Sequence, residues 1–210
     1  MENVERKLAS ELLRIKAVLL RPSDPFTWAS GWRSPIYCDN RRILGDPGLR
    51  GKVASWLAGR ARELFPEAET VAGVATGAIA HGALVADRLG KPFVYVRPKP
   101  KDHGTGSRIE GMLAPGSPTV VVEDLVSTGM SSLEAVKALR EAGARVLGMV
   151  AIFSYRFPEA EERFASEGVT LSTLSNYGAL LEEACESGFI EPSDMDVLRQ
   201  WRADPAGWMR

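Results

Sequence analysis

The chain has 210 residues, of which 45% are apolar and 25% are charged, a composition typical of a globular protein with a full core. Its formal net charge of −1 excludes a generally basic surface for nucleic acid or for an anionic membrane. The two cysteines, Cys38 and Cys185, form no CxxC or Cys/His pattern, so neither a disulfide framework nor a zinc site is expected.

The first residues show neither the basic segment nor the long apolar run of a signal peptide. The longest apolar stretches are also shorter than the ~20 residues that a membrane helix needs. Two reduced thiols suit a reducing compartment. We therefore expect a cytoplasmic protein that does not bind membranes.

The N-terminal segment predicts a helix followed by an irregular region. Apolar residues at helical spacing indicate an amphipathic helix over residues 2–20, ended by Arg21-Pro22 because proline disfavours the α conformation in the residue before it. Residues 22–40 mix prolines, aromatic residues and small polar residues. They predict a structured loop with a short strand near Ile36-Tyr37-Cys38.

A second helix is predicted from Asp46-Pro47 to Pro66, because aspartate caps helix N-termini and proline suits the first turn. Strands and helices then alternate, with strands at 70–75, 93–96, 119–123 and 146–153 and helices at 77–89 and 129–141. Gly90 and Gly143 are expected to end these two helices. The tail from about residue 157 adds helices and a short strand near 169–171.

Alternating strands and helices predict an α/β fold with a mostly parallel, twisted sheet flanked by helices. No repeat or linker is visible, so we expect a single domain over residues 1–210. Ligands of such sheets bind at the carboxyl ends of the strands. The loops after Ala75, Val96 and Glu123 are therefore the predicted site.

The most informative segment is residues 120–132, Val-Val-Val-Glu-Asp-Leu-Val-Ser-Thr-Gly-Met-Ser-Ser. An apolar strand leads to two acids, and a loop rich in hydroxyls and glycine then enters a helix. N–H groups at a helix start form a cradle for a monophosphate. Carboxylates just upstream can accept hydrogen bonds from the vicinal hydroxyls of a phosphorylated sugar. The alternative is an ordinary turn capped by Ser127 or Thr128, which gives the two acids no purpose.

The loop 97–111 carries several basic side chains, one histidine and three glycines. Its composition alone favours a solvated surface loop. Its position at the carboxyl edge, however, puts cations where a pyrophosphate leaving group needs neutralising. Gly104 and Gly106 would let the loop open and close. The glycine spacing does not match a dinucleotide-binding fingerprint.

Two of these segments resemble a known family over roughly residues 5–190. Residues 120–132 resemble the motif with which type I phosphoribosyltransferases bind 5-phosphoribosyl-1-pyrophosphate (PRPP). Lys101-Asp102-His103-Gly104 looks like the catalytic loop of the orotate phosphoribosyltransferases. The resemblance implies the type I phosphoribosyltransferase fold with an N-terminal hood.

The same resemblance assigns site residues. It implies that Arg97, Lys101 and His103 are catalytic, and that Pro98 replaces a lysine found in some members. The implied PRPP contacts are Arg97, Lys101, His103, Glu123, Asp124, Leu125, Val126, Ser127, Thr128, Gly129, Met130, Ser131, Thr76 and Gly77. From the residues alone, the Thr76-Gly77 turn is a weak signal that helix packing explains equally well. His81, one turn further on, is predicted to be structural.

Residues 26–39 resemble the family's hood, and we use this name for them below. Taken alone, aromatic residues in a loop are more often part of the core than a platform for a base. The resemblance implies instead that they sandwich a flat pyrimidine. It implies orotate contacts at Ser30, Tyr37, Cys38, Ser127 and Arg156.

The resemblance also implies an activity: transfer of the phosphoribosyl group from PRPP to orotate, giving orotidine 5'-monophosphate and pyrophosphate in pyrimidine and UMP biosynthesis. Mg²⁺ is the expected cofactor, held mainly by PRPP and without a direct protein ligand. A homodimer that shares loop 97–111 across its interface is expected, with no nucleic-acid partner. The expected organisation is a helix and hood (1–45), a PRPP-binding core (46–155) and a C-terminal elaboration (156–210).

Two alternatives stay open at this point. One is a type I phosphoribosyltransferase for a purine or uracil, which would share the PRPP site. The other is a non-catalytic PRPP-sensing regulator that binds nucleic acid, a role that needs a basic face. The Lys-Asp-His-Gly loop argues against the first, and the near-neutral charge argues against the second.

Overall fold

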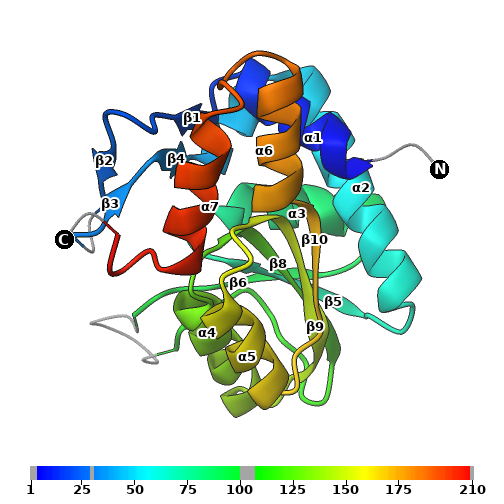
Figure 1. The fold of residues 1–210 in the computed structure, drawn as a ribbon. Helices are drawn as coiled ribbons and strands as arrows, with labels where there is room; N and C mark the ends of the chain where they lie inside the picture. The colour runs from blue at the N-terminus through cyan, green and yellow to red at the C-terminus, as the bar shows by residue number, and fades with distance from the viewer. Residues whose placement is uncertain (1–3, 29–30, 100–106, 209–210) are drawn as a thin grey trace.

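The computed structural model describes residues 4–28, 31–99 and 107–208 (Figure 1). In chain order its elements are α1 (Val4–Arg14), β1 (Val18–Leu20), β2 (Phe26–Thr27), β3 (Arg33–Ser34), β4 (Ile36–Cys38), the 3-10 helix η1 (Asn40–Gly45), α2 (Pro47–Leu64), β5 (Thr70–Val74), α3 (Ala78–Leu89), β6 (Phe93–Val96), β7 (Ile109–Glu110), β8 (Pro118–Val126), α4 (Met130–Glu141), β9 (Arg145–Ser154), α5 (Pro158–Ser166), β10 (Leu171–Asn176), α6 (Tyr177–Glu186) and α7 (Asp194–Ala203).

A six-stranded sheet forms the centre, in the order β10-β9-β8-β5-β6-β7. Every neighbouring pair is parallel except β6 and β7. Helix α3 packs on β5, β6 and β8, and α2 packs on α3 and β9. Figure 1 shows α4 and α5 on the opposite face of the sheet. The expected α/β fold with a mostly parallel sheet flanked by helices is confirmed.

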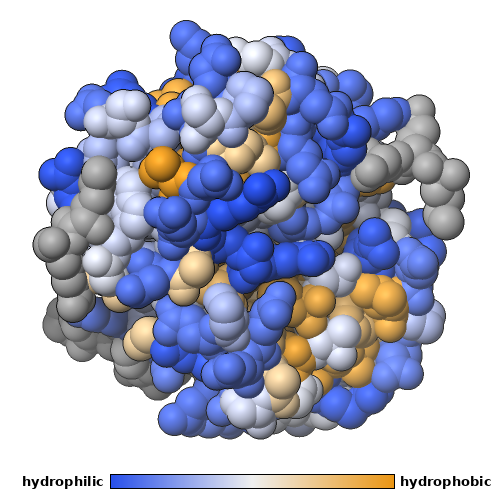
Figure 2. All heavy atoms as spheres, viewed as in Figure 1, coloured by the Kyte–Doolittle hydropathy of each residue, from blue (hydrophilic) through white to orange (hydrophobic). Residues whose placement is uncertain are grey.

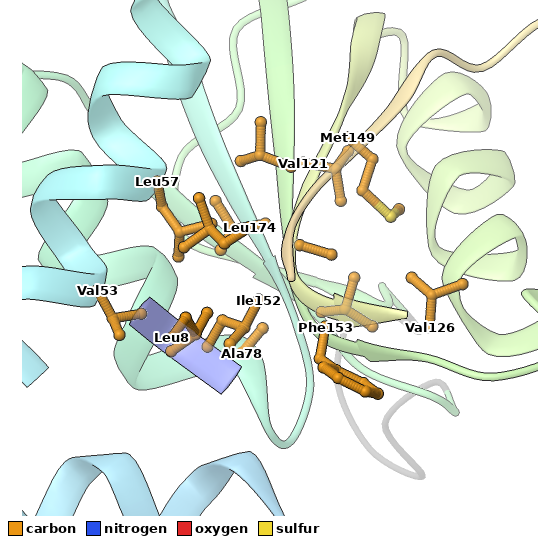
Figure 3. Packing of buried hydrophobic residues seen from close by; sticks show 14 of the residues in the cluster. Leu8, Val53, Leu57, Ala78, Val121, Val126, Met149, Ile152, Phe153 and Leu174 are labelled. Carbon is orange, nitrogen blue, oxygen red and sulfur yellow. The ribbon is translucent and has the colours of Figure 1, made fainter. Parts of the chain in front are cut away.

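The buried apolar side chains form one cluster that joins the helices to the sheet. In Figure 3, Val53 and Leu57 of α2 point toward Ile152 of β9 and Leu174 of β10. Truncating a buried leucine such as Leu57 to alanine typically costs about 2 to 5 kcal/mol. This core therefore fixes the sheet whose edge carries the site. Within the described ranges, no helix is long and apolar enough to span a membrane.

The hood lies outside the main sheet, on the side of α7 (Figure 1). Two short antiparallel pairs build this region: β1 with β4, and β2 with β3. The strand predicted near Ile36-Tyr37-Cys38 is confirmed as β4. The capping predictions also hold: the Asp46 side chain accepts a hydrogen bond from Leu49 N at 3.0 Å, and Gly90 ends α3 in the left-handed conformation.

The helix predicted over residues 2–20 is wrong beyond Arg14. Lys16 has a positive φ of 57°, and Ala17 N donates to Leu12 O at 2.9 Å, which closes the helix end. Residues 18–20 then pair with β4 as a strand. Their apolar side chains continued the helical spacing by coincidence, and pairing with a distant segment decided their conformation.

Two strand boundaries also differ from the prediction. Strand β8 runs on past the predicted end at Glu123 to Val126, so Asp124 also lies within the strand and not in the loop after it. The strand expected near 169–171 is β10 at Leu171–Asn176, a largely polar sequence that carries no apolar run. It forms because it can pair with β9 across five register positions.

Candidate active site

The carboxyl ends of the parallel strands bring three predicted loops to one edge of the sheet. Val74 of β5 pairs with Val96 of β6, and Val126 of β8 pairs with Ser154 of β9. The turn at Thr76-Gly77, the residues from Arg97 and the segment 127–131 therefore begin at the same edge. The three loops therefore share one edge, as expected, with the third loop starting after Val126.

Of the two acids, Glu123 is turned inward. Its side chain is only 4% exposed; Oε2 accepts from Ser132 Oγ at 2.8 Å and Oε1 accepts from Asp124 N at 3.0 Å. Burial, and then the neighbouring charge of Asp124, raises the pKa of Glu123 well above its usual value. Glu123 thus ties β8 to the first turn of α4, and both of its oxygens are already engaged.

Asp124 faces the edge of the sheet. Its carboxylate lies against Gly77, where a Cβ atom would overlap it. Its main-chain oxygen accepts from Asn40 Nδ2 at 2.6 Å, which ties the strand end to the start of η1. The Asp124 side chain is partly exposed. It is the acid that can meet a ligand at this edge.

Segment 127–131 forms a helix start without a side-chain cap. Gly129 has a φ of +79° and holds the N-cap position of α4, and no side chain of the described residues caps this turn. The alternative of Ser127 or Thr128 as N-cap is therefore wrong. Arg163 Nη1 donates to Thr128 O at 2.7 Å and so braces the turn from α5. Uncapped N–H groups at a helix N-terminus attract an anion.

A second uncapped helix start lies beside it. Gly77 is the N-cap of α3 and makes no side-chain cap bond. The preceding Ala75–Thr76 peptide is cis, and Ala75 N donates to Val96 O at 2.9 Å. The Thr76 side chain is exposed. The first turns of α3 and α4 thus both open on the edge that carries Asp124.

Arg97 stands at the base of loop 97–111. Its main-chain N donates to Arg108 O at 2.8 Å, and Arg108 Nε donates to Arg97 O at 3.0 Å. The buried Arg97 Nη1 lies 3.7 Å from Glu110 Oε1 and has no hydrogen-bond partner among the described residues. Lys101 and His103 lie outside the described residues.

Some aromatic residues of the hood pack toward the core, and others lie at the surface. Trp28 packs inward, where its Nε1 donates to Ile36 O at 3.0 Å. Tyr37 is 42% exposed, and its ring centroid lies 5.8 Å from that of Phe26. Cys38 Sγ lies 3.5 Å from Asn40 Oδ1, and burial raises the pKa of this thiol. Ser30 lies outside the described residues.

Arg156 follows β9 with a positive φ of 51°, and its main-chain N donates to Ser154 Oγ at 2.9 Å. It lines a groove of about 1340 Å³ between α2, α5 and β10, and no other predicted site residue lines this groove. Figure 2 shows apolar residues gathered on this face. Arg156 is thus the only described candidate site residue that lines this groove.

His81 is completely buried, as expected for a structural residue, yet both of its ring nitrogens lack a hydrogen-bond partner among the described residues. Burial lowers the pKa of His81, although the charge of Asp124 acts in the opposite direction. The imidazole is therefore neutral near pH 7. It lies beneath the start of α3, next to the acid that faces the ligand edge.

Sequence reasoning missed Asn40, Ser132 and Arg163. Each lies on a different element from the backbone or side chain that it holds, and only the fold brings them together. Ser132 alone carried a signal, as the last hydroxyl of the motif 120–132. Within the described ranges, no group of three His, Cys, Asp or Glu side chains could hold a metal ion.

Comparison with known proteins agrees with this geometry. The family model "Phosphoribosyl transferase domain" matches residues 41–181. The chain is 55% identical over 208 residues to the orotate phosphoribosyltransferase of Bacteroides thetaiotaomicron, covering 99% of this chain and 98% of that protein. It is 50% identical over 208 residues to that of Enterococcus faecalis, covering 99% of each. The crystal structure of orotate phosphoribosyltransferase from Aeropyrum pernix superposes with a TM-score of 0.76 at 34% identity, covering 88% of this chain and 99% of that one.

Proposed function

This chain belongs to the phosphoribosyl transferase family, and from its full-length relatives we infer that it is an orotate phosphoribosyltransferase, a pentosyltransferase of pyrimidine biosynthesis. The observation that carries this function is the meeting of Asp124 with the uncapped starts of α3 and α4 at one sheet edge. That edge offers two anion sites with a hydroxyl-binding carboxylate between them. PRPP has a monophosphate and a pyrophosphate joined by a ribose, which suits this order.

We propose that the 5-phosphate of PRPP binds the first turn of α4, at residues 127–131. The positive φ of Gly129 and the brace from Arg163 to Thr128 O support this role, since they keep the N–H groups free and in place. Leu125 and Val126 are the last two residues of β8 and lead directly into this turn.

Asp124 is the proposed acceptor for the ribose hydroxyls. Its carboxylate is partly exposed beside Gly77, between the two helix starts. Glu123 has both oxygens engaged with Ser132 and with the main chain of Asp124. We therefore propose that Glu123 contributes by holding Asp124 and α4 in register, and contacts ribose only if one of these bonds opens.

The reaction breaks the bond between C1 of the ribose and pyrophosphate, which leaves with the electron pair, and forms a bond from C1 to a ring nitrogen of orotate, whose proton is released to pyrophosphate or water. Positive charge develops on the ribose as pyrophosphate departs, so the enzyme's task is largely electrostatic. We propose that Thr76 and Gly77 bind pyrophosphate through the α3 start. Arg97, Lys101 and His103 would neutralise it, and closure of loop 97–111 would exclude water.

Mg²⁺ is the proposed cofactor. Bound to PRPP oxygens, which suit a hard cation, it would act as a template and neutralise phosphate charge. Asp124 is the described carboxylate nearest to the proposed ribose site. It would interact with the ion through the bound substrate and would not coordinate it directly. Its neighbour Glu123 is occupied inside the protein.

Orotate is proposed to bind under the hood, with Tyr37 and Cys38 on one side and Ser127 on the other. The exposed Tyr37 ring, supported by Phe26, provides a flat apolar surface for a pyrimidine. Ser30 is retained as a proposed contact. Arg156 lines a groove that no other described candidate site residue lines. Arg156 can therefore contact orotate only if the base reaches this groove.

We further propose a cytoplasmic homodimer that shares loop 97–111 between subunits, with the three-part organisation 1–45, 46–155 and 156–210. The position of the two ends of this loop supports its sharing between subunits. β7 is a two-residue strand at the end of the sheet order, so the described ends of loop 97–111 lie at the edge of the sheet.

The decisive experiment follows the loss of orotate absorbance with PRPP and Mg²⁺, against a panel of hypoxanthine, adenine and uracil. Orotate alone should be turned over efficiently. Comparable turnover of another base would favour a different phosphoribosyltransferase. If no base is consumed while labelled RNA or DNA binds tightly, the protein is a regulator and the enzymatic assignment fails.

A further inference from the structure

The C-terminal helix α7 places one tryptophan at the centre of an aromatic cluster that reaches the hood. Trp201 is 0% exposed. Its ring centroid lies 5.6 Å from Trp28, 5.8 Å from Tyr155, and 5.5 Å from both Phe157 and Tyr177. We call these five residues the aromatic hub. They come from the hood, the end of β9, α6 and α7, so one side chain joins four parts of the chain.

The polar atom of Trp201 is aimed at the hood. Its indole N–H donates to Arg33 O, the main chain of β3, at 3.1 Å. A buried N–H without a partner is costly, so this bond fixes the distance between α7 and the hood backbone. The helix itself is fixed in turn, because Tyr177 Oη donates to Leu198 O at 3.0 Å.

The hood is fixed at two places. At one end, β4 pairs with β1 over three positions. At the other end, strands β2 and β3 pair at only two positions, Phe26 with Ser34 and Thr27 with Arg33, and pairs this short are not independently stable. The bond from Trp201 to Arg33 O therefore holds the β2–β3 part of the hood against α7, which Figure 1 shows beside it.

The other end of the aromatic hub is anchored at the proposed ligand edge. Tyr155 directly follows β9, and its main-chain N donates to Val126 O at 3.1 Å. Val126 is the last residue of β8, before the proposed phosphate turn. The cluster thus spans from the hood to the sheet edge.

We propose that Trp201 is a positioning residue for the base: it sets the height of the hood above the carboxyl edge and thereby the affinity for orotate. This inference rests on the proposed function of the hood. The phosphate turn is held by the bonds from Arg163 to Thr128 O and from Ser132 to Glu123, and its link to the aromatic hub is the main-chain bond from Tyr155 N to Val126 O. None of these bonds involves the Trp201 side chain, so a change at Trp201 should affect the base site and leave the PRPP site in place.

The test is the Trp201→Phe variant, which keeps an aromatic ring in the hub but removes the donor to Arg33 O. We expect KM for orotate to rise about 2- to 10-fold, the range that one neutral hydrogen bond provides. KM for PRPP and kcat should stay within twofold. Phe189→Leu is the control, because Phe189 is an exposed aromatic residue between α6 and α7 that is not part of the aromatic hub. It should leave both KM values unchanged.

Trp28→Phe provides a second variant, since it removes the bond to Ile36 O from the hood side of the same cluster. It should raise KM for orotate in the same direction, and it serves if Trp201→Phe does not fold, as judged by thermal unfolding. An unchanged KM for orotate in folded Trp201→Phe, or an equal rise in both KM values, overturns the inference. If instead the wild-type protein does not consume orotate, the proposed function itself fails.

Discussion

The carboxylate of Asp124 rests against the α-carbon of Gly77, so that the acid at the end of β8 occupies the space where any other residue at position 77 would place its Cβ. The proposed ribose acceptor and the proposed pyrophosphate turn are therefore mechanically linked.

Gly77→Ala tests this link. The added methyl group must displace the Asp124 carboxylate, and overpacking of this kind costs about 1 to 3 kcal/mol. We expect kcat/KM for PRPP to fall about 5- to 150-fold, the same energy expressed as a ratio. Gly59→Ala is the control, because a Cβ at this α2 position meets nothing within 4 Å. Equal kinetics for the two variants would show that Asp124 moves freely.

Arg163→Met tests the brace on the phosphate turn. It removes the 2.7 Å bond from Arg163 Nη1 to Thr128 O but keeps an apolar stem. A hydrogen bond from a charged donor contributes about 1.5 to 3 kcal/mol, so KM for PRPP should rise roughly tenfold or more. Glu159→Gln removes only the 3.2 Å ion pair to the same guanidinium and should have little effect. The idea fails if both variants change KM alike.

The raised pKa of Glu123 predicts a pH dependence of stability. Its folded pKa lies above the unfolded value of 4.5, so the folded protein binds the proton more tightly. The free energy of unfolding should therefore fall as pH rises from about 4.5 through the folded pKa. Glu123→Gln should remove this slope in urea unfolding at pH 5 and pH 8. Glu141→Gln, exposed on α4, is the control and should keep the wild-type slope.

His81 predicts the opposite slope at lower pH. Burial lowers its folded pKa below the unfolded value of 6.5, so the unfolded chain binds more protons. Stability should fall as pH drops from about 6.5. His81→Leu replaces two unpaired nitrogens by an apolar group and should exceed wild type in stability at pH 5.5, measured by thermal unfolding. His103→Leu changes the only other histidine and should not reproduce this gain.

The proposed sharing of loop 97–111 predicts complementation. Lys101→Ala should lower kcat on the order of 100-fold, as expected for one preorganised electrostatic group. Asp124→Asn should weaken use of PRPP. Mixing the two chains should restore activity, because one site of each heterodimer combines an intact Asp124 with an intact Lys101. Subunit exchange is verified by mass spectrometry of differently tagged chains. Exchanged heterodimers no more active than their parents would place the loop in its own subunit's site.

The sequence predicted the parts of the fold that depend on local signals. The Asp46 cap, the Gly90 helix end and the valine-rich strand before Glu123 follow from residue types and spacing, and all three are present. Residues 18–20 were misassigned, since their conformation comes from pairing with β4. The polar strand β10 was misplaced for the same reason.

The site shows the same division. The motif 120–132 predicted a helix start with free N–H groups, because this signal lies in consecutive residues, and α4 begins at Gly129 without a side-chain cap. The inward position of Glu123 was not predictable, since it depends on Ser132 in the first turn of α4 and on burial by the rest of the fold. Likewise, the resemblance alone did not show that Trp28 packs against Trp201, which lies 173 positions later in the chain.

The two helices that open on the ligand edge both begin at a glycine without a side-chain cap. A capping serine or aspartate typically contributes about 1 kcal/mol to a helix, and neither of these helices has one. In the proposed complex, the phosphoryl groups of the substrate would take the place of both caps. Substrate binding should then stabilise the first turns of α3 and α4 as well as bring the reactants together.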